Sequence, residues 1–285
     1  MAVKRKTQSP KPKTQRNIRK TSKNKTSFFS SSLFFKVIMG FSLLAVLYSQ
    51  RGVFMRYLGF VTDKITYTEA RSMPIDKVLD THIEKSFGID ISEYQDKIDW
   101  DAVKEIEGGY PIEFAFIRAS VGNDRADYKF KKYWKKAKQK GLICGAYHYY
   151  RPNENSIAQA ENFIAQVTLV EGDFPPVLDI EKLPKAQSIE RLKVGLKRWL
   201  ETVEKHYGVK PIIYSSESYY EDFLKEDFED YPFWIANYTA FYKEIDDEWS
   251  LWQFTENGKV SGINGPVDLN VYNGNSVEMK ELLIK

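Results

Sequence analysis

The feature that most constrains the fold is an alternation of short apolar runs with helical patterns. Eight runs, each rich in β-branched and aromatic residues and bounded by turn residues, are typical of strands: Phe87–Ser92, Phe114–Ser120, Leu142–Tyr150, Pro176–Glu181, Lys210–Ser216, Phe233–Tyr238, Ser250–Thr255 and Val267–Asn273. Helical patterns separate the first five runs, at Asp99–Ile106, Tyr128–Lys140, Ser156–Val170 and Ser188–Tyr207. Strands that alternate with helices form parallel sheets or barrels, so we predict an α/β fold, a modified (β/α) TIM-like barrel. The last three runs lack helix-length spacers, and we expect that part of the barrel to be irregular.

The run Pro176–Glu181 ends in two carboxylates, Asp179 and Glu181. Side chains at i and i+2 of a strand point to the same face, so we expect the two acids to project together, roughly 7 Å apart at the backbone. Burial and mutual repulsion would raise the pKa of at least one of them toward neutrality. A carboxylic acid that stays protonated near pH 7 is the general acid that glycosidic-bond cleavage requires. The spacing alone is also compatible with two acids that cap a strand.

Two further acids, Asp90 and Asp268, lie between apolar neighbours in the first and last runs. In a (β/α) barrel the active site lies at the carboxyl ends of the strands. The first and last strands of a closed barrel are neighbours, so we expect Asp90 and Asp268 to lie side by side at the barrel mouth. Four acids in one place would cost stability, and we therefore interpret them as a carboxylate-lined site.

Aromatic and amide side chains at the ends of the other runs fit a sugar-binding site. Aromatic rings stack on the apolar faces of pyranose rings, and neighbouring polar groups bind the hydroxyls. The candidates for substrate binding are Tyr147, Tyr149, Tyr214, Trp234, Asn237, Trp252 and Gln253. Trp234 is equally compatible with a position in the core.

The stretches GIDIS (88–92), FAFIRAS (114–120), GAYHYY (145–150), PPVLDIE (175–181), PIIYSS (211–216), FWIANY (233–238), LWQFT (251–255) and VDLNVY (267–272) occur in an order that resembles one family. Residues 87–273 resemble the catalytic domain of the family 25 glycoside hydrolases, lysozymes that cleave peptidoglycan as N-acetylmuramidases. The resemblance implies a modified (β/α) barrel and hydrolysis of the β-1,4 bond between N-acetylmuramic acid and N-acetylglucosamine.

The resemblance also implies roles for the four acids. Glu181 would be the general acid/base, and Asp179 would stabilise the positively charged intermediate or orient the substrate acetamido group. Asp90 and Asp268 would line the floor of the site. The family uses no metal or organic cofactor. The three histidines are widely spaced and there is one cysteine, so the chain has no Cys/His metal-ligand spacing.

Three questions stay open at this point. The residues do not decide whether the covalent partner of the sugar is an aspartate or the substrate's own acetamido oxygen. A chitinase-type glycosidase would also use acids on one strand, but that pattern has a longer Asp-x-x-Asp-x-Asp-x-Glu array, and here Pro176, Val177 and Leu178 precede Asp179. A catalytically silent peptidoglycan-binding scaffold is the other alternative, and the presence of all four acids argues against it.

The first 85 residues predict a membrane anchor. Residues 1–27 carry ten Lys or Arg and no acid, which is typical of a cytoplasmic tail. Residues 28–49 are mostly apolar with only Lys36 charged, and no small-residue cleavage site follows, so we favour an uncleaved single-pass transmembrane helix over a cleaved signal. Residues 50–85 would form a juxtamembrane linker. The catalytic domain, residues 86–285, would then lie outside the cytoplasm, in the periplasm or at the cell surface.

The charge distribution supports the same division. The net charge of +3 arises from the N-terminal segment, because no acid precedes Asp63 and 13 of the 42 basic residues do. The rest of the chain has 29 basic and 39 acidic residues, a net charge of −10, so it offers no nucleic-acid-binding surface. We expect a monomer whose partners are the glycan strands of peptidoglycan and, through residues 28–49, the membrane.

Overall fold

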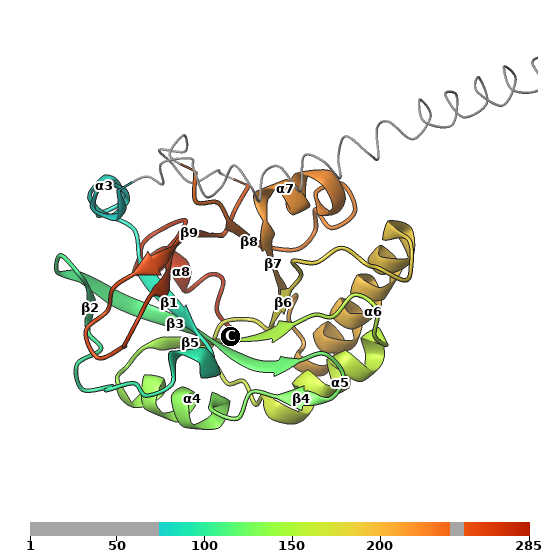
Figure 1. The fold of residues 1–285 in the computed structure, drawn as a ribbon, viewed down its shortest axis with the longest axis horizontal. Coiled ribbons are helices and arrows are strands. Elements are labelled where there is room, and N and C mark those ends of the chain that lie inside the picture. The colour runs from blue at the N-terminus through green and yellow to red at the C-terminus, as the bar shows by residue number, and fades with distance from the viewer. Residues whose placement is uncertain (1–73, 240–247) are drawn as a thin grey trace, which may run out of the picture. The chain divides into compact units, whose positions relative to one another are not determined.

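The computed structural model describes residues 74–239 and 248–285. The chain divides into two compact units, Met1–Phe54 and Met55–Lys285, and all described residues belong to the second. Its strands are β1 (Phe87–Ile91), β2 (Glu105–Ile106), β3 (Tyr110–Val121), β4 (Arg125–Ala126), β5 (Ile143–Tyr149), β6 (Val177–Asp179), β7 (Ile212–Ser216), β8 (Phe233–Ala236), β9 (Leu251–Gly258) and β10 (Val267–Tyr272). Its helices are α3 (Ile75–Thr81), η1 (Glu93–Gln95), α4 (Phe130–Gln139), α5 (Ser156–Gln166), α6 (Ile189–Tyr207), α7 (Glu217–Tyr219), η2 (Tyr220–Leu224) and α8 (Ser276–Met279) (Figure 1).

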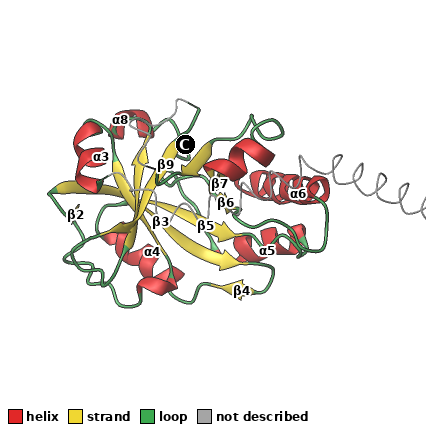
Figure 2. Ribbon diagram, turned by 45° about the horizontal axis from the view of Figure 1, so that its top comes forward, coloured by secondary structure: helices red, strands yellow, loops and turns green. Residues whose placement is uncertain are grey.

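Eight of the strands close into a barrel in the order β1, β3, β5, β6, β7, β8, β9, β10 and back to β1 (Figure 2). All neighbours are parallel except β10, which runs antiparallel to both β9 and β1. The eight runs expected to form strands are these eight barrel strands, so the predicted barrel is confirmed. Its predicted irregularity is the reversed strand β10, which follows β9 without a helix.

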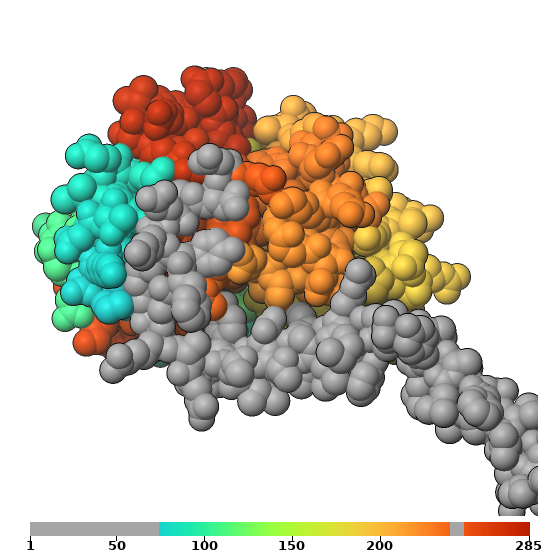
Figure 3. Space-filling model, turned by 90° about the horizontal axis from the view of Figure 1, so that it is seen from above, coloured from blue at the N-terminus to red at the C-terminus, as the bar shows by residue number. Residues whose placement is uncertain are grey.

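The ends of the barrel domain lie close together in space. In the space-filling view the earliest described residues (cyan) adjoin the last ones (red) (Figure 3). The backbone N–H of Ser86 donates to the Gly274 carbonyl, the N–H of Tyr272 donates to the Ser86 carbonyl, and these two bonds join the two parts of the chain. Helix α3 buries Val78 and Leu79 in the core, so the packed domain begins before the predicted boundary at residue 86.

The predicted helix over Asp99–Ile106 is wrong. This segment forms turns and ends in β2, which pairs antiparallel with β3. Trp100, Val103 and Ile106 are buried three residues apart, and this spacing resembles that of a helix face. The backbone N–H of Asp99 instead donates to Gly262 in another loop, so tertiary contacts replace the hydrogen bonds within a helix.

The interior of the barrel is filled with aromatic rings. Phe116 stacks on Trp234 with ring centroids 4.5 Å apart, and Phe174 packs against Phe116 at 4.7 Å. Gly145 makes this packing possible, because a Cβ there would lie 2.2 Å from the Phe116 ring. A second apolar cluster lies between the sheet and the helices α4, α5 and α6. The aromatic layer fills the barrel below its mouth, which stays open to solvent.

Among residues 74–239 and 248–285, no helix is both long and apolar enough to cross a membrane. The expected tail at 1–27, the expected anchor at 28–49 and most of the expected linker lie outside these described residues.

Candidate active site

A cavity of about 500 Å³ opens at the mouth of the barrel. All four acids singled out in the sequence line it: Asp90, Asp179, Glu181 and Asp268. Asp179 is the last residue of β6. The strand thus ends two residues before the predicted end at Glu181, which lies in the following loop. The serine hydroxyl of Ser215 on β7 donates to the carbonyl of Ile180 at 2.7 Å and holds the backbone between the two acids.

Asp90 and Asp268 are direct register partners on β1 and β10, as expected from their position in neighbouring strands. Burial raises the pKa of both carboxyl groups. The Oδ2 atom of Asp90 accepts hydrogen bonds from Gln253 at 2.8 Å and Asn270 at 2.9 Å, which stabilise its ionised form. Asp268 lacks these amide donors, and burial together with the charge of Asp90 raises its pKa to about 9. Asp268 therefore keeps a proton at neutral pH and shares it with the Asp90 carboxylate.

Asp179 and Glu181 lie in contrasting environments. Asp179 is 4% exposed, and its Oδ1 atom has no hydrogen-bond partner among the described residues. Burial, and then the charges of Glu181 and Asp90, raise the pKa of Asp179 well above its usual value. Glu181 is exposed to the cavity, and the Tyr149 hydroxyl hydrogen-bonds to it. The buried acid is thus paired with one that can reach a substrate.

Five of the seven predicted substrate-binding residues line the cavity: Tyr147, Tyr149, Tyr214, Trp234 and Gln253. The Tyr214 hydroxyl donates to the Gln253 side chain at 2.8 Å, and Gln253 in turn donates to Asp90. Trp234 is 1% exposed, and its indole N–H donates to Asn270 at 2.8 Å. Gln253 and Trp234 thereby orient the groups around the carboxylates.

The other two predicted substrate-binding residues, Asn237 and Trp252, lie away from the cavity lining. Trp252 is 1% exposed and packs in the outer core, and its indole N–H donates to the backbone carbonyl of Asn237 at 2.7 Å. The Asn237 side chain is fully buried and donates to Glu217 at 2.7 Å. These contacts join β8, β9 and α7 in the part of the barrel that lacks long helices.

Several residues that line the cavity or hydrogen-bond to its lining were missed in the sequence. Asn270 follows Asp268 at i+2 on β10, and the same spacing argument that joined Asp179 and Glu181 applies to it. Tyr238 donates to Gln253 and lies just beyond the end of β8. Tyr94 and Arg118 also line the cavity. Tyr94 lies in a loop with no apolar periodicity, so no sequence signal distinguished it.

Among the described residues, no group of three or more His, Cys, Asp or Glu side chains is arranged to hold a metal ion. The one cysteine, Cys144, is buried, and burial raises the pKa of its thiol to about 12.

A closed (β/α) barrel with carboxyl groups of raised pKa at the carboxyl ends of its strands has the architecture of a glycoside hydrolase. The sequence profile of the family described as glycosyl hydrolases family 25 matches residues 89–263, and the chain belongs to this family. The chain is therefore a glycoside hydrolase.

The chain is similar to individual relatives and to solved structures. The uncharacterized protein YegX of Escherichia coli (strain K12) is 41% identical over 197 residues, which cover 68% of this chain and 71% of the relative. Lysozyme M1 of Streptomyces globisporus is 30% identical over 210 residues, covering 68% of this chain and 70% of the relative. The structure of a family 25 glycosyl hydrolase from Bacillus anthracis matches with a TM-score of 0.62 and 31% identity, over 71% of this chain and 95% of that chain.

Proposed function

We propose that this protein is a peptidoglycan hydrolase that cleaves the β-1,4 bond between N-acetylmuramic acid and N-acetylglucosamine. The observation that carries the proposal is the presence in one cavity of buried Asp179 and exposed Glu181 at the end of β6, beside Asp90 and Asp268, which hydrogen-bond to each other. Relatives named as lysozymes, among them Lysozyme M1 and the autolytic lysozyme of Clostridium acetobutylicum, support this substrate over chitin.

The geometry suggests how the acids divide the work. Burial and the charge of Glu181 raise the pKa of Asp179, so ionisation of one of these carboxyl groups disfavours ionisation of the other. Glu181, which reaches the cavity, delivers a proton to the glycosidic oxygen, and the carboxylate charge faces the sugar as positive charge develops on it. The Asp90–Asp268 pair, with its proton on Asp268, adds the charge of Asp90 behind the site. Either an aspartate or the substrate acetamido oxygen bonds to the anomeric carbon as the protonated leaving sugar departs, and water then hydrolyses the resulting intermediate.

The test is hydrolysis of purified peptidoglycan and of chitin, with mass analysis of the new reducing ends. Muropeptides that end in reducing N-acetylmuramic acid are the expected product. Release of chitin fragments alone would support the chitinase-type alternative, and binding without release would support the scaffold.

Glu181→Gln tests the general acid directly. The amide keeps the size of the side chain but has no proton to deliver, so turnover should fall by about three orders of magnitude or more while the melting temperature stays the same. Glu84→Gln, a change at an exposed acid outside the cavity, is the matched control and should retain full turnover. If the Glu181→Gln variant keeps more than about a tenth of the turnover, Glu181 is not the general acid.

We also propose that residues 28–49 anchor the enzyme, with residues 1–27 in the cytoplasm and the barrel outside it. The basic tail followed by an apolar segment supports this topology. Cell fractionation with protease accessibility on intact and permeabilised cells tests it. We expect the barrel domain to fractionate with the membrane and to be cut once protease reaches the extracytoplasmic side. A soluble product shortened near residue 49 would show that the apolar segment is a cleaved signal.

A further inference from the structure

Tyr94 is an exposed aromatic residue at the rim of the catalytic cavity. Its side chain lines the cavity, and the residue is 73% exposed. Tyr149, whose hydroxyl hydrogen-bonds Glu181, lines the same cavity. Tyr94 therefore shares one cavity with the proposed general acid.

The loop that carries Tyr94 is held firmly in place. Ser92 and Gln95 form a capping box around η1, in which the Ser92 hydroxyl accepts from the Tyr94 backbone N–H at 3.3 Å and Gln95 accepts from the Ser92 N–H at 2.7 Å. The backbone N–H of Glu93 donates to Asp127 at 2.9 Å. At the end of the loop, Lys129 bonds to the Asp96 carbonyl at 2.6 Å. The backbone at Tyr94 is thus fixed from both sides.

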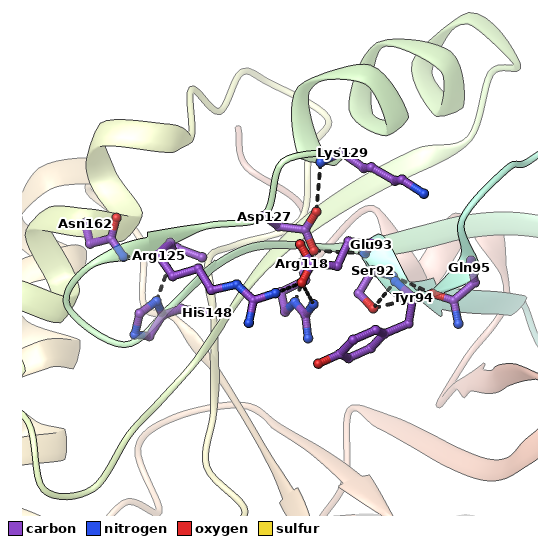
Figure 4. A network of polar contacts seen from close by, with 11 residues as sticks. Ser92, Glu93, Tyr94, Gln95, Arg118, Arg125, Asp127, Lys129, His148 and Asn162 are labelled. Atoms are coloured by element: carbon purple, nitrogen blue, oxygen red, sulfur yellow. Dashed lines mark hydrogen bonds and ion pairs between the residues drawn. The ribbon is translucent and has the colours of Figure 1, made fainter.

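An ion-pair network lies behind the Tyr94 ring, and all its members except Arg125 are buried (Figure 4). The Arg118 guanidinium carbon lies 4.7 Å from the centre of the ring. Arg118 is held by Glu93 at 3.2 Å and by Asp127 at 3.1 Å, and Arg125 also pairs with Glu93. Two arginines and two acids balance in charge, so the network is neutral as a whole. Its contribution is to support one face of the ring while the rest of the ring stays open to the cavity.

We propose that Tyr94 is a stacking platform for a sugar ring of the glycan strand, next to the ring that occupies the catalytic carboxylates. A pyranose ring presents an apolar C–H face that packs on an aromatic ring. Because the loop and Arg118 fix the tyrosine before the sugar binds, little side-chain freedom is lost on binding. The occupant is an uncharged N-acetylhexosamine ring, which suits a neutral wall. This inference rests on the proposed function, since it assigns a second sugar-binding position in the same cavity.

Tyr128 provides a matched control. It is also 73% exposed, and a cation also lies against its ring, with Lys129 Nζ 5.4 Å from the ring centre. Tyr128 does not line the cavity. The two tyrosines therefore differ in their position relative to the cavity and resemble each other in exposure and in the neighbouring cation.

The experiment measures binding of soluble chitopentaose to the full chain in detergent, in the Glu181→Gln background so that no cleavage occurs. Adding Tyr94→Ala should weaken binding about three- to tenfold, because one aromatic contact is lost. Tyr94→Phe keeps the ring and should bind as well as the parent, and Tyr128→Ala should have no effect. Equal affinity of the Tyr94→Ala and parent proteins would overturn the proposal. So would an equal loss in Tyr94→Phe, which would assign the effect to the hydroxyl.

A kinetic experiment separates this inference from the proposed function. In the catalytically competent protein, Tyr94→Ala should raise KM for peptidoglycan three- to tenfold with kcat nearly unchanged, as expected for an interaction made equally in the ground and transition states. An active parent with an unaffected Tyr94→Ala variant would refute the platform and leave the hydrolase proposal intact. An inactive parent whose chitopentaose binding still depends on the Tyr94 ring would refute the hydrolase proposal and support the platform.

Discussion

Asp90 and Asp268 are hydrogen-bonded to each other, and their surroundings decide which of the two carboxyl groups carries the shared proton. Two side-chain amides, from Gln253 and Asn270, donate to Asp90 and favour its ionised form. Asp268 does not receive these two amide hydrogen bonds, and burial together with the charge of Asp90 raises its pKa to about 9. A carboxyl group held neutral in the folded protein is a source of pH-dependent stability, because the unfolded chain releases that proton near pH 4.

Asp268→Asn should therefore stabilise the protein at alkaline pH. The Asp268 pKa rises from 3.8 to about 9 on folding, so the native state binds more protons between these values and stability falls as pH rises through this window. The asparagine is neutral in both states, and we expect its melting temperature to exceed that of the parent by about 3 °C or more at pH 8, with little difference at pH 4. Thermal unfolding at both pH values is the measurement, with the exposed change Glu229→Gln as control. If the melting temperature differs from that of the parent by the same amount at both pH values, the raised pKa of Asp268 is contradicted.

Asp179→Asn should shift the pH profile of activity. Burial and the charge of Glu181 raise the pKa of Asp179, and this repulsion acts equally on both carboxyl groups. Without the charge at position 179, the remaining acid loses its proton at a lower pH, so the basic limb of the kcat profile should move down while turnover falls strongly. An unchanged basic limb would mean that the two groups are not coupled.

At the scale of elements, the direction of β10 decides the composition of the site. Asp268 is the second residue of β10, and in a parallel strand it would lie at the opposite end of the barrel from Asp179. Because β10 runs antiparallel to β1, its beginning lies beside the end of β1, and Asp268 meets Asp90 at the mouth. The same reversal brings Asn270 within reach of Asp90 and Trp234.

The packing inside the barrel predicts the effect of a methyl group on β5. Gly145→Ala would place its Cβ 2.2 Å from the Phe116 ring, and this ring stacks on Trp234 below the site. We expect a loss of about 1–3 kcal/mol in the free energy of unfolding, measured by chemical denaturation. Phe116→Leu in the same protein should recover part of that loss, because the smaller side chain leaves room for the methyl group. If the losses from the two changes simply add, the residues are not in contact.

At the scale of the whole molecule, the barrel closes only through the C-terminal part of the chain. Strand β10 pairs with β1 on one side and β9 on the other, although the family profile ends at residue 263, before β10 begins. A barrel without this strand would expose two unpaired edges and lose Asp268. Closure of the barrel and the position of Asp268 in the cavity therefore depend on the same strand.

Truncation tests this dependence. A chain that ends after Gly265 lacks β10 and should lose cooperative thermal unfolding and its near-ultraviolet circular dichroism. A chain that ends after Lys280 keeps β10 but loses the buried Leu283, the partly buried Leu282 and the backbone hydrogen bonds between Ile284 and the segment at Gly172 and Asp173. This control should melt at a lower temperature but still cooperatively. Cooperative unfolding of the shorter chain would show that β10 is dispensable for the fold.

Much of the site could be read from the sequence because it depends on local patterns. An acid between apolar residues, as at Asp90 and Asp268, is aligned by the two-residue period of a strand, and that period is a property of the backbone. This period turns the acids toward the inside of the barrel, and all four line one cavity once the reversal of β10 brings Asp268 to the mouth. The same patterns did not predict which loop residues line the cavity. Tyr94 was missed because the geometry of its loop depends on contacts with distant residues such as Asp127.

The sequence by itself determined which segments form the eight barrel strands, since each strand needs only an apolar run of the right length between turn residues. It also determined that four acids occupy strand ends. Only the tertiary structure decided that β10 is reversed, that Trp252 and Asn237 support the sheet away from the cavity, and that Asn270 and Gln253 donate to Asp90. Those outcomes depend on contacts between side chains of strands that are far apart in the sequence. The packing of the whole barrel determines these contacts, and no local sequence pattern encodes it.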